Sequence, residues 1–573
     1  MTQGMRKGLT SYGDADFSLF LRKAFIKAMG LSDDALARPV VGIANTFSDY
    51  NACHGNVPKL VEAIKRGVML AGALPMEFPT ISIHESFAHP TSMFLRNLMA
   101  MDTEEMIRAQ PMDAVVLIGG CDKTIPAQMM ACASADVPTV IVPVGPMLVG
   151  NYQGEQLGAC TDCRRLWGEH RGGRIDAQEI ERINERLAPT PGTCMVMGTA
   201  STMACVVEIM GLALPRSATI PATHADRLRS AEASGQFAAA MAVNGSPRPS
   251  QLMTRAAFRN AMVVVQAIGG STNSLIHLTA AAGRLGIKID LEEFDRLGRE
   301  VPVLVDLKPS GRHYMEHFHW AGGVPRLMRE LEGLLDLDAL TVTGGTLRDA
   351  MQAAEDVPGQ DVIRPRSAPI KDCGSMAVLG GNLAPRGAII KQSAASESLM
   401  AHTGRAVVFE SVEDLTLRID DPALDVTADD VLVLRNAGPR GAPGMPEAGY
   451  LPIPRKLAQQ GVKDMVRISD ARMSGTAFGT IVLHIVPESA AGGPLALVRN
   501  GDRISLDVPG RRIDLLVSED ELAARREHER LHPNPAAAVA PDRGYAALFH
   551  RTVLQADEGC DFDFLVPGHG SEA

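Results

Sequence analysis

The sequence lacks the features that mark membrane, nucleic-acid-binding and disulfide-rich proteins. No stretch approaches the roughly 18 to 20 apolar residues of a membrane span, and the first 14 residues lack the apolar core of a signal peptide. No basic run occurs, and 67 Asp and Glu outnumber 56 Lys and Arg, so nucleic-acid binding has little support. Nine scattered cysteines are too sparse for a secreted disulfide scaffold. We therefore expect a cytoplasmic protein whose reduced thiols are free to bind metal.

Aromatic residues are also scarce, at 4% of the chain, while glycine (54) and methionine (28) are plentiful. A hydrophobic content of 46% and a charged content of 21% are typical of a globular protein. A chain of 573 residues is too long for one ordinary hydrophobic core, so we expect two or more domains. The net charge of -11 means that an anionic substrate would need local cations or a metal ion to hold it.

The most informative stretch is a short apolar run followed by a glycine turn. Residues 115–118 read Val-Val-Leu-Ile, as expected of a strand buried on both faces of a parallel sheet. The turn that follows reads Gly119-Gly120-Cys121-Asp122-Lys123-Thr124. Burying these polar side chains is costly unless they bind something, and ligands bind at the carboxyl ends of strands in such sheets. A turn that merely caps a helix is the alternative, but capping requires neither Cys121 nor Lys123. A phosphate loop is disfavoured because Asp122 stands where a glycine should precede the lysine.

Further strands of the same sheet are predicted by apolar segments at residues 40–46, 80–83 and 139–142. Helical spacing follows the first two of these segments, so strands and helices alternate. This alternation indicates a parallel α/β sheet whose polar loops meet at one edge. Cys53 lies in the loop after the first predicted strand, and Glu85 follows the second. Taken alone, Cys53 would more often be a buried structural thiol.

The amino-acid composition changes between about Asp356 and Pro385, where prolines and glycines cluster. Short β-branched strands separated by Gly/Pro turns then follow, as in a β-barrel or sandwich. They are predicted at residues 406–409, 431–434, 480–483, 503–506 and 513–516. We therefore predict an α/β N-terminal domain with a parallel sheet at 1–370, a linker at 371–385, and a C-terminal β-barrel-like domain at 386–573.

Several loop residues outside the central turn carry reactive groups. Cys194 lies in a glycine-flanked turn like that of Cys121. Glu447 and Ser474 lie in glycine-rich loops of the predicted second domain, where a solvated acid and a turn residue are the simplest interpretations. The motif Cys160-Thr161-Asp162-Cys163 invites a redox or zinc interpretation. We interpret it as incidental, because no second pair stands at zinc-finger spacing.

These candidates form a soft and a hard set of metal ligands. Three thiolates, from Cys53, Cys121 and Cys194, suit zinc or an iron–sulfur cluster. A [2Fe–2S] cluster usually has four cysteine ligands, so three would leave one iron position open for Lewis-acid chemistry. Carboxylate oxygens suit Mg²⁺. Because Cys121 and Asp122 are adjacent, they would hold the two metal sites close together.

Five segments together resemble one family. They are Asn51-Ala52-Cys53-His54, Gly119-Gly120-Cys121-Asp122-Lys123-Thr124, Gly192-Thr193-Cys194, Pro443-Gly444-Met445-Pro446-Glu447 and Asp470-Ala471-Arg472-Met473-Ser474-Gly475-Thr476. In this order across nearly the whole chain, they resemble the dihydroxy-acid and sugar-acid dehydratases. The resemblance implies the α/β and β-barrel architecture in a homodimer or homotetramer. It also implies a [2Fe–2S] cluster on the three cysteines named above, and Mg²⁺ on Glu85, Asp122, Glu447 and a carbamylated Lys123.

The same resemblance implies that a polyhydroxy acid loses water. Ser474 would remove the C2 proton, Thr476 would either orient Ser474 or donate to the substrate, and the open iron would take the leaving 3-hydroxyl. The loop forms, among them His84-Glu85-Ser86, look closer to the sugar-acid branch, so we expect an aldonate such as arabinonate, xylonate or gluconate. Three alternatives stay open: a dihydroxy-acid dehydratase of branched-chain amino-acid biosynthesis, a non-catalytic iron–sulfur redox or sensor protein, and a zinc hydrolase.

Overall fold

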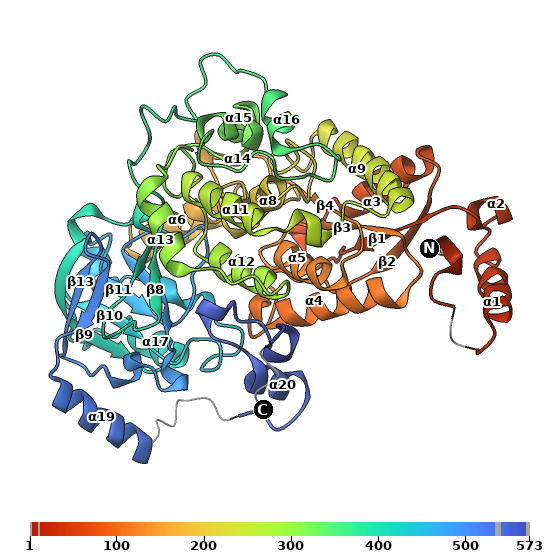
Figure 1. Ribbon diagram of the computed structural model, residues 1–573. Helices are drawn as coiled ribbons and strands as arrows, with labels where there is room; N and C mark the ends of the chain where they lie inside the picture. The colour runs from red at the N-terminus through yellow and green to blue at the C-terminus, as the bar shows by residue number, and fades with distance from the viewer. Residues whose placement is uncertain (1–2, 10–11, 533–539, 569–573) are drawn as a thin grey trace.

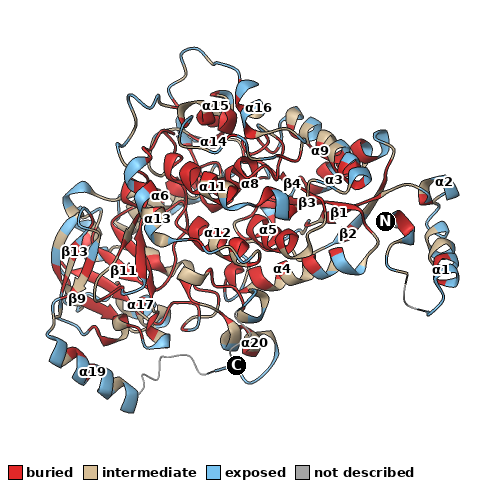
Figure 2. Ribbon diagram, viewed as in Figure 1, coloured by how far each residue is buried: buried red, intermediate tan, exposed pale blue. Residues whose placement is uncertain are grey.

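The computed structural model describes residues 3–9, 12–532 and 540–568. Two sheets organise these residues, one in the N-terminal half and one in the C-terminal half (Figure 1). Figure 2 shows that the central strands of both sheets are largely buried, while exposed residues lie on the outer strands, helices and loops. Among the described helices, none combines the length and the apolar character that crossing a membrane requires.

The N-terminal sheet has four parallel strands in the order β2-β1-β3-β4. They span Val40–Asn45 (β1), Leu74–Pro79 (β2), Ala114–Gly119 (β3) and Thr139–Pro143 (β4). Strands β3 and β4 are buried throughout, as the unbroken apolar runs predicted.

The second predicted strand, at residues 80–83, is wrong. The strand lies at β2 instead, where Leu74 pairs with Val40 and Pro79 pairs with Asn45. Residues 80–83 lie beyond the end of β1 and have no strand beside them to pair with. The prolines of β2 argued against a strand in the sequence, because proline cannot donate a backbone hydrogen bond. Strand β2 is an edge strand, however, and proline is tolerated at an edge.

Helices cover both faces of this sheet. Helices α3 (Val57–Leu70) and α9 (Ala225–Asn244) lie on one side, and α4 (Ser92–Ala109) and α5 (Thr124–Ala135) lie on the other (Figure 1). The α3–α9 pair packs closely at Gly67, where an added Cβ would collide with the carbonyl of Glu232. This close approach explains why small residues are abundant in the chain.

The C-terminal sheet has eight strands in the order β14-β13-β9-β10-β11-β12-β8-β7. Four neighbouring central strands are parallel: β9 (Ala401–Phe409), β10 (Val431–Leu434), β11 (Arg467–Ser469) and β12 (Ile481–Val486). Antiparallel strands flank them: β7 (Ala377–Leu379), β8 (Gly387–Ile390), β13 (Arg503–Asp507) and β14 (Arg512–Leu515).

The two edges of the eight-stranded sheet meet. Gly380, just after β7, donates its backbone N–H to the carbonyl of Arg511 (2.9 Å) and accepts one from Ile513 of β14 (2.8 Å). The sheet therefore closes nearly into a barrel, and the predicted fold class is confirmed. The division of the chain at residues 371–385 stays a prediction.

The end of the described chain returns to the N-terminal half. Asp561 forms a fully buried ion pair with Arg284, with Arg284 Nη2 3.0 Å from Asp561 Oδ1. Arg96 of α4 donates to the carbonyls of Gly559 (2.8 Å) and Cys560 (2.9 Å). Removing Arg284 would leave the buried charge of Asp561 without its ion-pair partner, so these contacts fix the two halves against each other.

The remaining elements complete the two layers. Helices span Ala15–Lys27 (α1), Asp33–Leu36 (α2), Thr161–Arg171 (α6), Ala177–Asn184 (α7), Thr199–Ile209 (α8), Pro249–Leu252 (α10), Arg255–Ala267 (α11), Asn273–Gly283 (α12), Leu291–Glu300 (α13), Met315–Trp320 (α14), Gly323–Glu330 (α15), Leu347–Gln352 (α16), Val412–Arg418 (α17), Arg455–Gln459 (α18), Glu519–Leu531 (α19) and Gly544–Thr552 (α20). A small hairpin joins Gly150–Tyr152 (β5) and Glu155–Leu157 (β6).

Candidate active site

Polar loops from both sheets converge at the carboxyl ends of parallel strands. In the N-terminal half, Cys53 follows β1, Glu85 follows β2, and Cys121 to Lys123 follow β3. In the C-terminal half, Glu447 lies between β10 and β11, and Ser474 lies between β11 and β12. Both sheets thus place these polar side chains at the edge where parallel sheets ordinarily bind their ligands.

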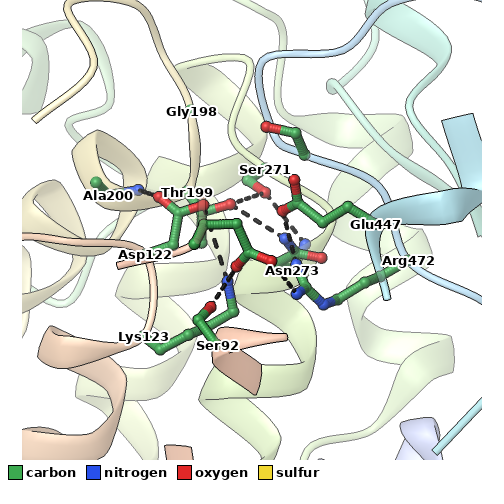
Figure 3. A network of polar contacts seen from close by, with 12 residues as sticks. Ser92, Asp122, Lys123, Gly198, Thr199, Ala200, Ser271, Asn273, Glu447 and Arg472 are labelled. Atoms are coloured by element: carbon green, nitrogen blue, oxygen red, sulfur yellow. Dashed lines mark hydrogen bonds and ion pairs between the residues drawn. The ribbon is translucent and has the colours of Figure 1, made fainter. Parts of the chain in front are cut away.

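Three carboxylates form one group, which we call the carboxylate cluster: Glu85, Asp122 and Glu447. Each offers an oxygen within 4.8 Å of the others. Lys123 Nζ lies 2.9 Å from Glu85 Oε2 and 3.8 Å from Asp122 Oδ2. Arg472 bridges the two halves, 3.0 Å from Glu85 and 2.6 Å from Glu447 (Figure 3). Both cationic side chains are fully buried.

The pKa values show that the carboxylate cluster is short of positive charge. Burial raises the pKa of Asp122, and burial together with the charge of Glu85 raises the pKa of Glu447 to about 7. Burial also acts to raise the pKa of Glu85, but Arg472 and Lys123 outweigh it and hold that pKa well below its usual value. Three acids facing two cations are a favourable place for a divalent cation.

The thiols lie beside the carboxylate cluster. Sulfur atoms of Cys53 and Cys121 and a ring nitrogen of His84 lie within 4.8 Å of one another. Cys194 lies outside that tight group, and its Sγ is 3.5 Å from Cys160 Sγ. The pKa of Cys194 is held well above its usual value by its hydrogen bond to the Cys160 thiol, by burial and by the nearby Cys53. Sequence reasoning missed His84 as a candidate ligand, although it directly precedes Glu85.

His54 fixes the two thiol loops to each other. Its Nδ1–H donates to the carbonyl of Thr46 (2.8 Å), which leaves Nε2 to accept the backbone N–H of Cys121 (3.2 Å). Burial lowers the pKa of His54 to about 4, so the ring is neutral at pH 7. His54 directly follows Cys53 in the short 3₁₀ helix Ala52–His54, so its hydrogen bond to the backbone of Cys121 links the two cysteine loops.

The serine loop is held from several sides. Ser474 Oγ and Thr476 Oγ1 are 2.8 Å apart. The Asn273 amide donates to the carbonyl of Met473 (3.1 Å) and to Thr199 Oγ1 (3.1 Å) (Figure 3). Such a buried, hydrogen-bonded loop leaves Ser474 little freedom, as a reacting group requires.

Arg164 connects the groups described above, and sequence reasoning missed it. Its Nη1 donates to Thr476 Oγ1 (3.2 Å) and to the carbonyl of Cys160 (3.3 Å), and its Nη2 lies 4.0 Å from Glu447. Arg164 also lines a pocket of about 730 Å³ between α6, α17 and η5 (Glu447–Tyr450), with four other cationic residues. These are Arg165, Arg171, Arg174 and Lys463. The lining also includes Glu169 and Asp420, so five cations face two acids, and an anion approaching this acidic chain would still be attracted there.

Lys391 is a second buried lysine near the serine loop. Its Nζ donates to the carbonyl of Gly475 (3.3 Å), and burial lowers its pKa to about 7. The pKa of an unfolded lysine is near 10.4, so burying Lys391 costs no stability above that pH. As the pH falls from about 10.4 to about 7, the unfolded state gains a proton that the folded state lacks, and the free energy of unfolding decreases. The Lys391→Met variant, which keeps the volume, is therefore expected to raise Tm by a few degrees at pH 7 and less at pH 9.5. Thermal unfolding at both values measures this, and an equal shift at both would contradict it.

The donor atoms fit two different metal groups. Paired thiols are soft ligands of the kind that bind iron–sulfur clusters, and converging carboxylates are hard ligands of the kind that bind Mg²⁺. The two sets adjoin at Cys121 and Asp122, which are neighbours in the chain. An α/β half and a barrel half that enclose converging polar side chains between them are typical of an enzyme active site.

Comparison with known proteins identifies the family. Residues 38–350 match the dihydroxy-acid/6-phosphogluconate dehydratase N-terminal family, and residues 361–560 match the corresponding C-terminal family. The chain therefore belongs to this family of dehydratases, and the predicted resemblance is confirmed.

Three relatives are similar over almost their whole length. The L-arabonate dehydratase of Azospirillum brasilense is 49% identical, over 98% of this chain and 97% of that protein. The L-arabinonate dehydratase of Rhizobium leguminosarum bv. trifolii is 45% identical, over 97% and 95%. A dihydroxy-acid dehydratase of Moorella thermoacetica is 38% identical, over 94% and 97%.

Proposed function

We propose that this protein is a sugar-acid dehydratase that converts a C5 or C6 aldonate, such as arabinonate, xylonate or gluconate, to its 2-keto-3-deoxy acid. The relatives named for arabonate and arabinonate are 49% and 45% identical, whereas the one named for dihydroxy acids is 38% identical. This difference favours the sugar-acid branch over the branched-chain alternative. The cationic pocket beside Arg164 suits an anionic substrate of this kind.

One observation carries the proposal: the Arg164 side chain contacts the serine loop, the carboxylate cluster and the thiol region together. Its bonds to Thr476 and to the Cys160 carbonyl, and its approach to Glu447, bring the proposed base beside both proposed metal sites. A non-catalytic iron–sulfur carrier has no need for a buried serine or for a carboxylate cluster. The geometry therefore supports an enzyme over a carrier.

The same arrangement supports the cofactors that the family resemblance implies. Cys53, Cys121 and Cys194 would hold a [2Fe–2S] cluster. Mg²⁺ would be held by Glu85, Asp122, Glu447 and a carbamylated Lys123. When bound, these groups supply Lewis-acid stabilisation of the substrate carboxylate and of the leaving 3-hydroxyl.

Ser474 is the proposed base that takes the C2 proton. Arg164 donates to Thr476 Oγ1, so the Thr476 hydroxyl is free to donate its own proton to Ser474 Oγ. This charge-assisted chain favours the alkoxide form of Ser474, which an isolated serine would not reach near pH 7. Thr476 therefore orients the base, and Arg164 acts through Thr476 as a positioning residue.

An anaerobic assay with a substrate panel tests this function. We expect Mg²⁺-dependent formation of a 2-keto acid from at least one aldonate, faster than from 2,3-dihydroxy-isovalerate, together with iron and acid-labile sulfide in the protein. Preference for the branched-chain acid over every aldonate would reverse the substrate assignment. Zinc without sulfide would instead favour the hydrolase alternative.

We also propose that the protein is cytoplasmic and works as a homodimer or homotetramer. All nine cysteines are unpaired, which supports a reducing compartment. Helix α1 projects from the body of the protein (Figure 1) and exposes Phe17, Phe20 and Phe25. Adjacent exposed aromatic side chains support a contact with a second copy. Light scattering should give a mass of two or four chains, and a stable monomer would contradict this.

A further inference from the structure

The Cys160–Cys163 motif has no part in the function proposed above, yet the structure places it at the thiol site. Cys160 immediately precedes α6, and its Sγ lies 3.5 Å from Cys194 Sγ. The Cys163 thiol donates to the carbonyl of Cys160 (2.7 Å) and also contacts the Cys160 side chain, but no contact with Cys194 is found for it among the described residues. Of the two cysteines, only Cys160 has its sulfur beside that of Cys194.

The distance between the two sulfurs suits joint coordination. Two thiolates on one tetrahedral metal, at about 2.3 Å each, lie about 3.8 Å apart. Cys53 and Cys121 form a second close pair within the same region. Two pairs of thiols are the usual ligand set of a [2Fe–2S] cluster, in which each iron has two cysteines.

The segment that carries Cys160 is firmly anchored. Thr161 Oγ1 donates to the carbonyl of Thr476 (2.9 Å). Asp162, which is almost fully buried, accepts from the backbone N–H of Gly158 (2.8 Å) and from Lys308 Nζ (2.8 Å). These contacts hold the backbone on both sides of Cys160, so its position beside Cys194 is set by the fold.

We propose that Cys160 is a fourth sulfur ligand of the cluster site in the substrate-free enzyme. This inference rests on the [2Fe–2S] cluster of the proposed function and deepens it. Because the proposed dehydration uses an open iron position, the Cys160 thiolate would have to leave that position when the substrate hydroxyl binds. Until then, the thiolate would keep oxygen and water away from it. Cys160 would thus protect a cluster that three cysteines alone would leave exposed.

Cluster spectroscopy on matched alanine variants tests this. Wild type, Cys160→Ala and Cys163→Ala are reconstituted anaerobically, and their iron and sulfide contents, visible circular dichroism and Mössbauer spectra are compared. We expect all three to hold iron and sulfide, with a changed spectrum in Cys160→Ala alone and several-fold faster bleaching of that variant in air. An aldonate should shift the wild-type spectrum toward that of Cys160→Ala.

The outcomes separate this inference from the proposed function. Spectra and bleaching rates of Cys160→Ala equal to those of wild type would overturn the fourth ligand, while aldonate dehydration by wild type would stand. Wild type without iron and sulfide would overturn the cluster itself, and the inference with it. A Cys163→Ala spectrum that changes as much as that of Cys160→Ala would also overturn the assignment, because a structural effect of the motif would then explain both.

Discussion

The Ser474→Ala variant is expected to lose at least about a thousandfold in kcat while keeping its iron, its sulfide and its visible spectrum. Ser474 Oγ is hydrogen-bonded to Thr476, and among the described residues no hydrogen bond joins this hydroxyl to a thiol or to the carboxylate cluster. Its removal should therefore delete the base without disturbing either metal site. Single-turnover formation of the 2-keto acid, measured beside metal content, separates the two effects.

Ser234→Ala is a matched control. Ser234 is also a buried serine, but it lies on α9, where its hydroxyl donates to the carbonyl of Ser230 (2.8 Å). We expect this variant to keep wild-type kcat. Activity retained by Ser474→Ala would remove Ser474 from the role of base. Loss of iron from Ser474→Ala would show that the serine supports the cluster instead.

The N-terminal sheet was predictable because its strands are buried on both faces. Strands β3 and β4 are unbroken apolar runs, which can be recognised in the sequence without knowing which strands they pair with. Strand β2 was displaced because its position depends on pairing with β1, and its prolines are tolerated only at an edge. In the barrel, β7 and β11 have three residues each, too few to show an alternation, and both were missed.

The same distinction applies to the candidate site. Cys121, Asp122 and Lys123 follow one another after a glycine turn, so they can be recognised as candidate site residues from the local sequence alone. Arg472 and Arg164 belong to the site because of contacts with residues hundreds of positions away in the sequence. Arg472 pairs with Glu85 across the two halves, and Arg164 donates a hydrogen bond to Thr476. Neither an arginine in a loop, such as Arg472, nor one in a helix, such as Arg164, gives a local sign of such a partner. Long-range pairing therefore supplies the part of the site that sequence patterns leave out.

The Lys123→Met variant is expected to lose at least about a hundredfold in Mg²⁺-dependent activity, because the terminus of Lys123 lies within the carboxylate cluster. If the three acids are ionised and the Lys123 amine is protonated, these groups and Arg472 carry a net charge of minus one. Addition of CO₂ to the neutral amine would release a proton and form a carbamate, and the net charge would become minus three. One Mg²⁺ would then restore minus one, so carbamylation would supply the negative charge that the proposed metal ion needs.

Lys391 provides the matched control, since it is the other lysine that the structure buries completely within its described residues. After incubation with ¹³C-bicarbonate, a carbamate signal in the NMR spectrum should appear in wild type and in Lys391→Met and be absent from Lys123→Met. Loss of the signal in Lys391→Met instead would assign the carbamate to Lys391, whose pKa of about 7 also leaves much of its amine neutral. A Lys123→Met protein that keeps its Mg²⁺-dependent activity would show that the three carboxylates hold the metal ion without help, and the charge argument for the carbamate would then fail.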